Sequence, residues 1–323
     1  MAGGEFELIN HYFKPAPEDL VADDVVLGIG DDAALVQPPT GELLAVATDT
    51  LVADVHFPAD ADAALIAERS MRVNLSDLAA MGAEPRWFTL ALTLPGDWDG
   101  EKRQHWVAGF SRALKSCANT FGCTLIGGDT TRGPLSVGIQ MLGSVPASQA
   151  LRRDGAGLDD FVLVTGVLGD AAAALTVLDE PASDRNDYLR GRYYKPTPRI
   201  AEGKYLRGIA SSAQDISDGL LADLGHICFA SDVAAELDLA QLPFSEVLAE
   251  QPQAEAIEHA IAGGDDYELV FTVPPENMPE LAMLQAAGKV QATVIGRIVS
   301  GAGVHCELDG APYYSNATGY KHF

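Results

Sequence analysis

The chain is poor in cysteine and in long apolar runs, and each shortage excludes a class of protein. Its four cysteines, Cys117, Cys123, Cys228 and Cys306, form no Cys-x-x-Cys pair. This spacing argues against a zinc knuckle and a disulfide framework, so we expect reduced thiols in a core. No apolar run reaches the about 18 residues of a membrane span. The first residues also lack the basic and apolar regions of a signal peptide.

Basic residues are scarce as well. Lys and Arg number 21 against 46 Asp and Glu, which gives a formal net charge of −25. So acidic a chain is repelled by nucleic acid and by anionic membranes, and we expect neither as a partner. With 47% hydrophobic residues in 323, the chain is long enough for two globular domains. We therefore expect a cytosolic (cytoplasmic) protein that meets anionic ligands through metal ions.

Standard nucleotide and hydrolase motifs are also missing. There is no Gly-x-x-x-x-Gly-Lys-Ser/Thr, and Ala33 stands where a dinucleotide-binding loop starting at Gly28 needs its third glycine. There is no Gly-x-Ser-x-Gly elbow and no kinase His-Arg-Asp or Asp-Phe-Gly. Any ATP chemistry must then depend on metal ions and positioning, as phosphoryl transfer generally does.

What the sequence contains instead is a series of acidic clusters at the ends of predicted strands. These clusters include Asp31-Asp32, Thr48-Asp49-Thr50, Asp77, Gly128-Asp129, Asp215 to Gly219 and Gly263 to Glu268. Their oxygens suit Mg²⁺, which commonly takes one or two carboxylates together with substrate phosphates. A single Gly-Asp or Ser-Asp also serves as a turn or a helix cap, so only the joint occurrence favours metal sites.

Hydrophobic periodicity predicts alternating strands and helices in both halves, an α/β (α+β) organisation. Helices are expected over 5–13, 62–81, 101–121, 171–178, 199–209, 220–230 and 276–287. Strands are expected within 25–35 and over 43–50, 85–94, 123–127, 136–145, 161–165, 233–239, 269–273, 293–299 and 304–308, with one more ending at 215. The polar segment 180–198 is predicted to be a loop or lid.

Two further side chains lie close to these clusters in the sequence. His56 follows Thr48-Asp49-Thr50 and is a candidate for ligand contact, although a lone histidine is more often structural. Arg153 stands at the start of the second half, where it could meet a phosphate or remain on the solvated surface.

Taken together, the motifs resemble the thiamine-monophosphate kinase family. The matching stretches are 4–6, 28–34, 48–52, 56–57, 74–83, 127–131, 217–220, 266–269 and 319–323, which span nearly the whole chain. The resemblance implies a two-domain fold like that of aminoimidazole ribonucleotide synthetase. Residues 1–147 would form an α/β domain that binds metal and ATP and dimerises through its strands. Residues 148–323 would form an α/β domain that completes the ATP and substrate site.

The resemblance also implies an activity. It implies that ATP phosphorylates thiamine monophosphate to thiamine diphosphate, the final step of thiamine diphosphate biosynthesis. Transfer of the γ-phosphoryl group would be direct and in line, assisted by several Mg²⁺ ions, in a homodimer. A monophosphate acceptor is already largely anionic near neutral pH, since its second pKa is about 6, so no strong general base is needed.

Site roles are carried over by motif. The implied magnesium ligands are Asp32, Thr48, Asp49, Asp77, Asp129, Asp215 and Asp218, of which Asp49, Asp77 and Asp129 are the catalytic residues. The implied ATP contacts are Gly128, Asp129, Arg153 and Ser217, and the implied substrate contacts are His56, Asp265 and Tyr320. Asp265 replaces the family's usual glutamate, so its contact would be longer or water-bridged. Ala317 replaces an aromatic residue that some members have, so stacking on thiamine would fall to Tyr320.

Two alternatives remain open from the sequence. One is another enzyme of the same fold, but a selenophosphate synthetase would carry a reactive cysteine near its N-terminus, and here none precedes Cys117. A hydrogenase-maturation protein would end in cysteine, whereas this chain ends in Phe323. The other alternative is an acidic metal-binding module without catalysis, which would lack turnover of ATP with thiamine monophosphate.

Overall fold

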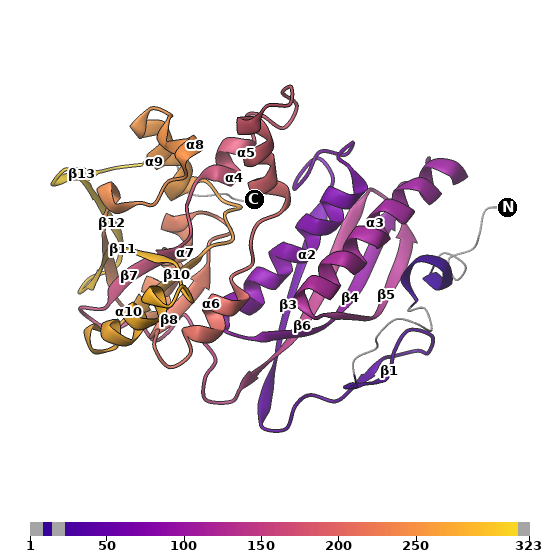
Figure 1. Ribbon diagram of the computed structural model, residues 1–323, viewed down its shortest axis with the longest axis horizontal. Helices are drawn as coiled ribbons and strands as arrows, with labels where there is room; N and C mark the ends of the chain where they lie inside the picture. The colour runs from indigo at the N-terminus through magenta and orange to yellow at the C-terminus, as the bar shows by residue number, and fades with distance from the viewer. Residues whose placement is uncertain (1–8, 15–22, 316–323) are drawn as a thin grey trace. The chain divides into compact units, whose positions relative to one another are not determined.

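The structure is a computed structural model that describes residues 9–14 and 23–315 (Figure 1). The chain divides into two compact units. The first contains 1–78 and 84–147, and the second contains 79–83 and 148–323. Residues 79–83 join the second unit because they bond to it: Arg207 Nε donates to the Gly82 carbonyl at 2.6 Å, and the Leu151 N–H donates to the Met81 carbonyl at 3.1 Å.

The first unit is a layer of helices on a mixed sheet. Its four strands run in the order β3-β6-β4-β5, with β4 parallel to β5 and antiparallel to β6. The elements are β3 (Glu42–Val52), α2 (Ala63–Ala80), β4 (Glu84–Leu94), α3 (Gly100–Phe121), β5 (Thr124–Arg132) and β6 (Ser136–Pro146). Figure 1 shows α2 and α3 lying over one face of this sheet. These elements confirm the predicted helices and strands to within a few residues at their ends.

Sequence signals explain where the helices stop and start. The side chain of Asp99 accepts the Lys102 N–H at 2.8 Å and caps the start of α3. Gly122 ends that helix in the left-handed conformation, with φ of 69°, where a glycine costs least. Gly82 ends α2 in the same way, with φ of 62°.

The two faces of the first sheet differ. Leu90 and Ile139 are buried on the face that the helices cover, and Gly143 on that face has Leu78 of α2 directly above it. Side chains alternate along a strand, so the intervening residues point to the opposite, open face. On that open face Leu44 and Val46 of β3 are 43% and 55% exposed. The first unit therefore presents apolar side chains on a sheet face.

The N-terminal stretch is less regular than predicted. In place of one strand within 25–35, two short strands, β1 (Val25–Leu27) and β2 (Leu35–Val36), pair antiparallel with each other. The predicted helix over 5–13 is described only from Ile9 onward, where η1 (Ile9–Phe13) forms a short π-helical turn. Its first residues lie outside the described part of the chain.

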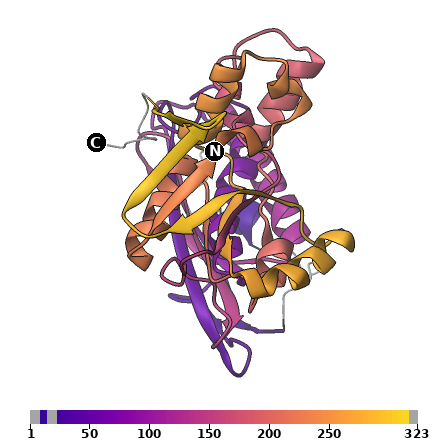
Figure 2. The same cartoon turned by 90° about the vertical axis from the view of Figure 1, so that its left-hand side faces the viewer.

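The second unit is built on a seven-stranded sheet with the order β13-β12-β9-β11-β7-β10-β8. Its strands are β7 (Phe161–Thr165), β8 (Ser212–Asp215), β9 (Ala234–Asp238), β10 (Leu269–Val273), β11 (Ala292–Val299), β12 (Gly303–Leu308) and β13 (Ala311–Tyr313). Figure 2 looks toward this unit, with β12 in yellow. The central strands β7 and β10 are buried on both faces, and their sequences are accordingly apolar apart from Thr165 and Thr272.

The helices of the second unit include several that the sequence did not predict correctly. They are α4 (Asp170–Ala174), α5 (Asp184–Tyr194), α6 (Ile200–Tyr205), α7 (Leu220–Ser231), η2 (Leu239–Gln241), α8 (Glu246–Ala249), α9 (Gln253–Ala262), η3 (Pro275–Asn277) and α10 (Met278–Ala286). The predicted loop or lid over 180–198 is wrong, because α5 occupies most of it. Ser183 caps α5 by accepting the Asn186 N–H at 3.2 Å. The helix expected over 171–178 ends at Ala174.

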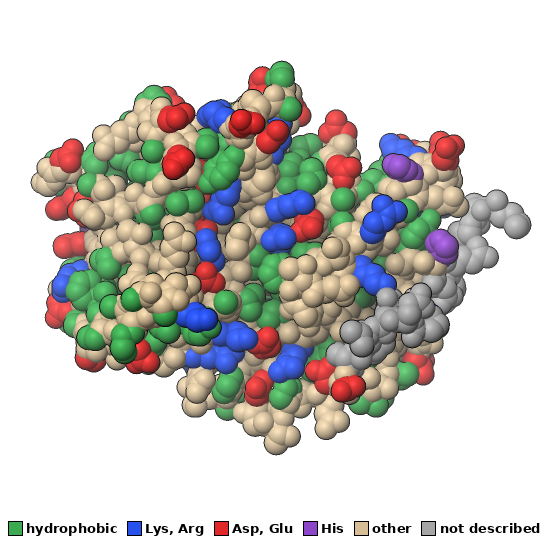
Figure 3. Space-filling model, viewed as in Figure 1, with side chains coloured by type: hydrophobic (Ala, Val, Ile, Leu, Met, Phe, Trp, Pro, Cys, Tyr) green, Lys and Arg blue, Asp and Glu red, His purple; other side chains and the backbone are tan. Residues whose placement is uncertain are grey.

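The remaining composition-based expectations concern thiols, membranes and charge. All four cysteines are thiols, as expected, and three of them are buried; burial raises the pKa of the Cys228 thiol to about 11. Within the described ranges, no helix is both long and apolar enough to cross a membrane. Acidic side chains occur at many separate places on the visible face (Figure 3), so the net charge of −25 is not confined to one patch.

Candidate active site

The structure places Asp49 and Asp77 close to one side chain of α2. The Asp49 N–H donates to the side-chain oxygen of Asn74 at 2.9 Å, and Asn74 is held by its own bond to the Ser70 carbonyl. Asp77 lies three residues after Asn74, so the two are neighbours on one side of the helix. Both Asp49 and Asp77 are half-buried. The structure thus associates two of the three predicted catalytic carboxylates, one from β3 and one from α2.

The third predicted catalytic carboxylate, Asp129, lies elsewhere in the first unit. Strand register puts Asp49 in one row with Ile139, Leu90 and Gly128, on the face covered by the helices. Asp129 belongs to the next row, on the open face, and is exposed. It also lies on β5, three strand spacings from β3, or about 14 Å. Within this unit Asp129 and Asp49 therefore lie on opposite edge strands and on opposite faces of the sheet.

Gly128 has a steric reason to be glycine. A Cβ placed there would lie 2.0 Å from the Leu90 carbonyl oxygen of the neighbouring strand. Only a residue without a side chain allows β5 to approach β4 this closely.

Thr48 and Asp32 are both exposed, on different elements. Thr48 points to the open face in one row with Gln140. Asp32 lies in the segment between β1 and β2, where its N–H donates to the side chain of Asp31 at 2.8 Å. Asp31 is thus engaged in its own turn, which leaves Asp32 as the candidate ligand of this pair.

His56 is fixed by the end of β3. The ring Nδ1 of His56 accepts the Val52 N–H at 3.0 Å, and the backbone N–H of His56 donates to the Val52 carbonyl at 2.9 Å. Arg69 Nε also donates to the His56 carbonyl at 3.1 Å. In a neutral ring with Nδ1 as acceptor, Nε2 carries the proton and can donate. The residue therefore has a structural role that is compatible with a donor function on the other nitrogen.

In the second unit, two loops bring several predicted residues together. One carries Asp215, Ser217 and Asp218 from the end of β8 to the start of α7, and the other carries Asp265 before β10. The Asp265 N–H donates to the Ser217 carbonyl at 2.9 Å. A Cβ at Gly264 would lie 2.2 Å from the same carbonyl oxygen, so this approach requires glycine. Asp265 itself has a positive φ of 69°.

Asp223 is a residue of this site that the sequence analysis missed. It lies in the first turn of α7, and its Oδ2 accepts the N–H groups of Ser217, Asp218 and Gly219 at 2.9, 3.0 and 3.1 Å. Burial raises its pKa to about 6, although these hydrogen bonds act in the opposite direction. The available signal was an acidic residue in the first turn after Ser-Asp-Gly.

Arg153 is exposed at the start of the second unit. Its carbonyl accepts the Ser231 hydroxyl at 2.8 Å, which ties this loop to the end of α7. The neighbouring Arg152 is ion-paired with Asp154. Of these two arginines, Arg153 is thus the candidate for meeting a phosphate.

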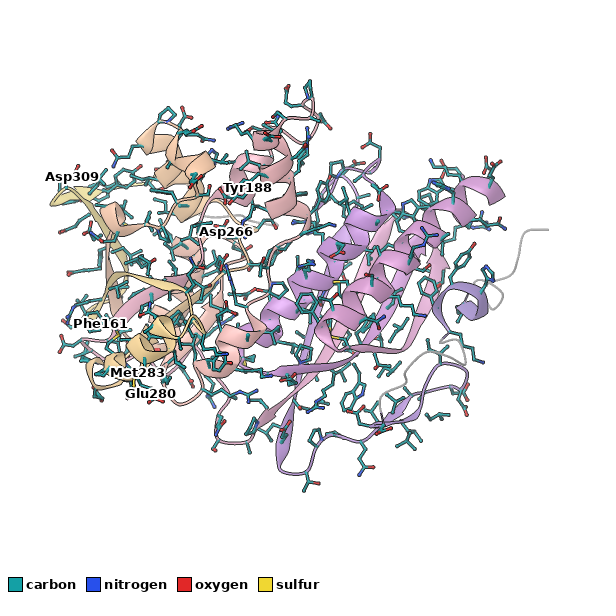
Figure 4. All side chains as sticks on the ribbon, in the orientation of Figure 1. Phe161, Tyr188, Asp266, Glu280, Met283 and Asp309 are labelled. Carbon is teal, nitrogen blue, oxygen red and sulfur yellow. The ribbon has the colours of Figure 1, made fainter. Side chains whose placement is uncertain are left out.

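A buried ion network includes residues that directly follow Asp265 in the sequence. It contains three carboxylates, Asp170, Asp266 and Glu268, and two guanidinium groups, Arg192 and Arg199. The sequence analysis placed Asp266 and Glu268 in an acidic cluster that suits Mg²⁺, but it did not predict that they are buried or that Glu268 pairs with arginines. Figure 4 labels Asp266, which belongs to the loop, and Tyr188 of α5, which donates to Asp170 at 2.8 Å.

Glu268 is the centre of this network. Its Oε1 accepts Arg192 Nη2 at 3.0 Å and Arg199 Nη2 at 2.7 Å, and its Oε2 accepts the Thr165 hydroxyl at 2.7 Å. Asp266 is different, because among the residues that the structure describes both of its oxygens accept a single N–H, that of Gly169. Burial raises the pKa of Asp266 well above its usual range, which favours the protonated form of this side chain. The ion pairs to the two guanidinium groups come from Asp170 and Glu268.

The donor chemistry of these residues fits magnesium. The predicted ligands offer only carboxylate and hydroxyl oxygens, the type that Mg²⁺ prefers. No set of three or more His, Cys, Asp and Glu side chains placed to hold a metal exists among the described residues. Tyr320, the predicted stacking residue, lies outside the described part of the chain.

Comparison with known proteins defines the class first. Residues 30–145 match the N-terminal domain of AIR synthase related proteins, and residues 159–309 match the C-terminal domain. A crystal structure of thiamine-monophosphate kinase from Stenotrophomonas maltophilia superposes with a TM-score of 0.82 and 45% identity, covering 90% of this chain and 93% of that one. The chain is thus a two-domain protein of the AIR synthase related class.

Within this class, two further relatives are informative. The chain is 47% identical to thiamine-monophosphate kinase of Escherichia coli, over 100% of this chain and 99% of that protein. A structure of AaThiL complexed with AMPPCP and TMP has a TM-score of 0.77 and 32% identity, covering 91% of this chain and 92% of that one. The chain belongs to the thiamine-monophosphate kinase family, as its motifs indicated.

Proposed function

We propose that the chain transfers the γ-phosphoryl group of ATP to thiamine monophosphate, yielding ADP and thiamine diphosphate. The observation that carries this proposal is the 47% identity to the Escherichia coli kinase over the full chain. The related AaThiL structure, which holds an ATP analogue together with TMP, supports the same pair of substrates. The reaction would complete thiamine diphosphate biosynthesis, in the cytoplasm.

This reaction requires charge neutralisation at the phosphates, and the carboxylate and hydroxyl groups described above can hold the magnesium that would supply it. The acceptor phosphate is largely anionic near neutral pH, since its second pKa is about 6, so it needs no strong base. The obstacle is repulsion between this nucleophile and the triphosphate. Bound magnesium would neutralise charge on both partners and stabilise the transferring group. The residues proposed to hold it are Asp32, Thr48, Asp49, Asp77, Asp129, Asp215 and Asp218.

The remaining roles fall to residues that bind and orient the substrates. Gly128, Asp129, Arg153 and Ser217 are proposed ATP contacts. His56, with Nε2 as a donor, and Asp265 are proposed contacts for thiamine monophosphate, together with Tyr320. The short Asp265 side chain is presented on a loop held against Ser217, and this fixed position supports an orienting role. We propose direct in-line transfer without a phosphorylated protein.

A turnover assay tests the proposal. The protein with ATP and Mg²⁺ is expected to convert thiamine monophosphate to thiamine diphosphate, measured by chromatography, and to leave free thiamine unphosphorylated. Free thiamine lacks the phosphate nucleophile, so it is the matched control acceptor. Rapid-quench samples are expected to contain no phosphorylated protein. ATP hydrolysis without thiamine diphosphate, or a covalent phospho-protein that turns over, would contradict the proposal.

We also propose that the protein is a homodimer through the strands of its first unit. The exposed Leu44 and Val46 on the open sheet face support this, because apolar side chains on a sheet gain stability when a partner covers them. Light scattering is expected to give about twice the chain mass of 34.1 kDa. Val46→Glu is expected to shift the protein toward monomer, whereas Leu158→Glu, on an exposed position of the second unit, is not. A monomeric wild-type protein would refute the dimer.

A further inference from the structure

The loop before α7 is organised around one buried carboxylate. The N–H groups of Ser217, Asp218 and Gly219 all donate to Oδ2 of Asp223, and Gln214 Nε2 donates to its Oδ1 at 2.6 Å. Only 1% of Asp223 is exposed. One side chain thus accepts hydrogen bonds from three consecutive backbone groups and from a neighbouring strand.

Consecutive N–H groups at a helix start normally form an anion-binding site. Their dipoles converge, and the helix adds partial positive charge, so phosphate binds there in many proteins. Here the chain fills that position with its own carboxylate. The N–H groups are therefore unavailable to a bare phosphate, and the start of α7 carries negative rather than positive charge.

The opposite side of the same loop is also engaged. The Ser217 carbonyl accepts the Asp265 N–H, and the Ile216 carbonyl accepts the Tyr267 N–H at 2.8 Å. Gly264 packs against Ser217 with no room for a Cβ. The loop is therefore held from two sides, and its contacts to a ligand must come from the side chains of Ser217 and Asp218 rather than from N–H groups.

We propose that Asp223 is a positioning residue that fixes this loop and reserves the start of α7 for a cation that accompanies the nucleotide. The inference rests on the proposed function, which assigns Ser217 to ATP and Asp215 and Asp218 to magnesium. This role explains why acidic residues cluster at a helix start. A site for a bare phosphate would instead favour a helix start without acidic residues. Asp223 itself touches neither metal nor nucleotide; it acts through the loop.

Asp223→Asn removes the charge and keeps the shape. The amide oxygen can accept the three N–H groups while its NH₂ faces Gln214, whose Oε1 has no hydrogen-bond partner among the described residues and can accept after an amide flip. We expect Mn²⁺, measured by calorimetry in the presence of AMPPCP, to bind about tenfold more weakly, as for other residues that orient metal ligands. The Mg²⁺ concentration for half-maximal activity should rise by the same factor, with the KM for thiamine monophosphate unchanged.

Asp223→Ala offers a complementary test, because it leaves the three N–H groups without an acceptor. Added formate should occupy the vacated position and restore Mn²⁺ affinity in this variant, and should have no effect on the wild type. Asp238→Asn is the matched control: Asp238 also accepts a backbone N–H, from Ala240 at 3.1 Å, and a glutamine amide, from Gln241 at 3.3 Å, but at the end of β9. This control should bind Mn²⁺ like the wild type.

Hydrogen exchange on the wild type keeps the proposal testable even if the variants do not fold. The amides of Ser217, Asp218 and Gly219 should be protected without nucleotide, and fast exchange of all three would overturn the proposal. Unchanged Mn²⁺ affinity and Mg²⁺ requirement in a folded Asp223→Asn protein would also overturn it. Absence of kinase activity in the wild type would refute the proposed function instead, and the Mn²⁺ comparison would still decide the role of Asp223.

Discussion

Glu268→Gln is expected to lower the free energy of unfolding by about 3–5 kcal/mol, the usual cost of removing one partner from a buried ion pair. The glutamine cannot balance the positive charge of Arg192 and Arg199, which both donate hydrogen bonds to Glu268 in the interior. Unfolding in urea, followed by far-UV circular dichroism, measures the effect. The three tryptophans, Trp87, Trp98 and Trp106, all belong to the first unit. Their fluorescence transition should shift less than the dichroism transition.

Asp266→Asn is the matched control from the same loop. Burial raises the pKa of Asp266 well above its usual range and favours its neutral form, so asparagine, another neutral acceptor of the Gly169 N–H, is a conservative replacement. The expected loss is below about 1 kcal/mol. Equal losses for Glu268→Gln and Asp266→Asn would contradict this assignment of charge within the network.

The same assignment predicts a pH dependence with a definite sign. An aspartate whose pKa is higher in the folded than in the unfolded state contributes stability at low pH and loses it as the pH rises toward the folded-state value. The wild type should therefore lose stability relative to Asp266→Asn as the pH rises above about 3.9, the unfolded value. A wild type that gains stability relative to this variant over that range would show that Asp266 is ionised in the fold.

The largest expected effect on activity concerns Asp49 and Asp77. Asp49→Ala or Asp77→Ala should reduce kcat by at least about 10²–10³-fold, since each removes a group proposed to hold the charge-neutralising metal at the transferring phosphate. Both side chains are only half-buried, so the fold should persist in either variant. Steady-state formation of thiamine diphosphate measures the loss, with circular dichroism as the check on folding.

Asp60→Ala serves as the control for this pair. Asp60 is an exposed carboxylate of the same unit, in the turn before α2, and should leave turnover unchanged. Near-wild-type activity of either Asp49→Ala or Asp77→Ala would remove the metal hypothesis for this part of the site.

Local patterns predicted the elements whose buried faces are apolar. The apolar spacing in α2 and α3 gave both helices to within a few residues, and the apolar run of β7 gave its bounds as observed. The same reasoning failed for α5. The buried side of this helix includes Arg192, paired with Glu268 from a distant part of the chain, and a search for apolar periodicity treats such a residue as solvated.

By itself, the sequence determined the two-domain α/β class, the family, and the acidic positions around which the site is built, because each of these depends on short motifs and local periodicity. Only the tertiary structure decided how those positions are distributed. Strand register separates Asp129 from Asp49, and contacts across the second unit bring Asp265 to Ser217. The fold also decided the role of Glu268, whose partners Thr165, Arg192 and Arg199 lie far away in the sequence. The role of Asp223 depends on local contacts, but only the conformation of the loop before α7 shows them.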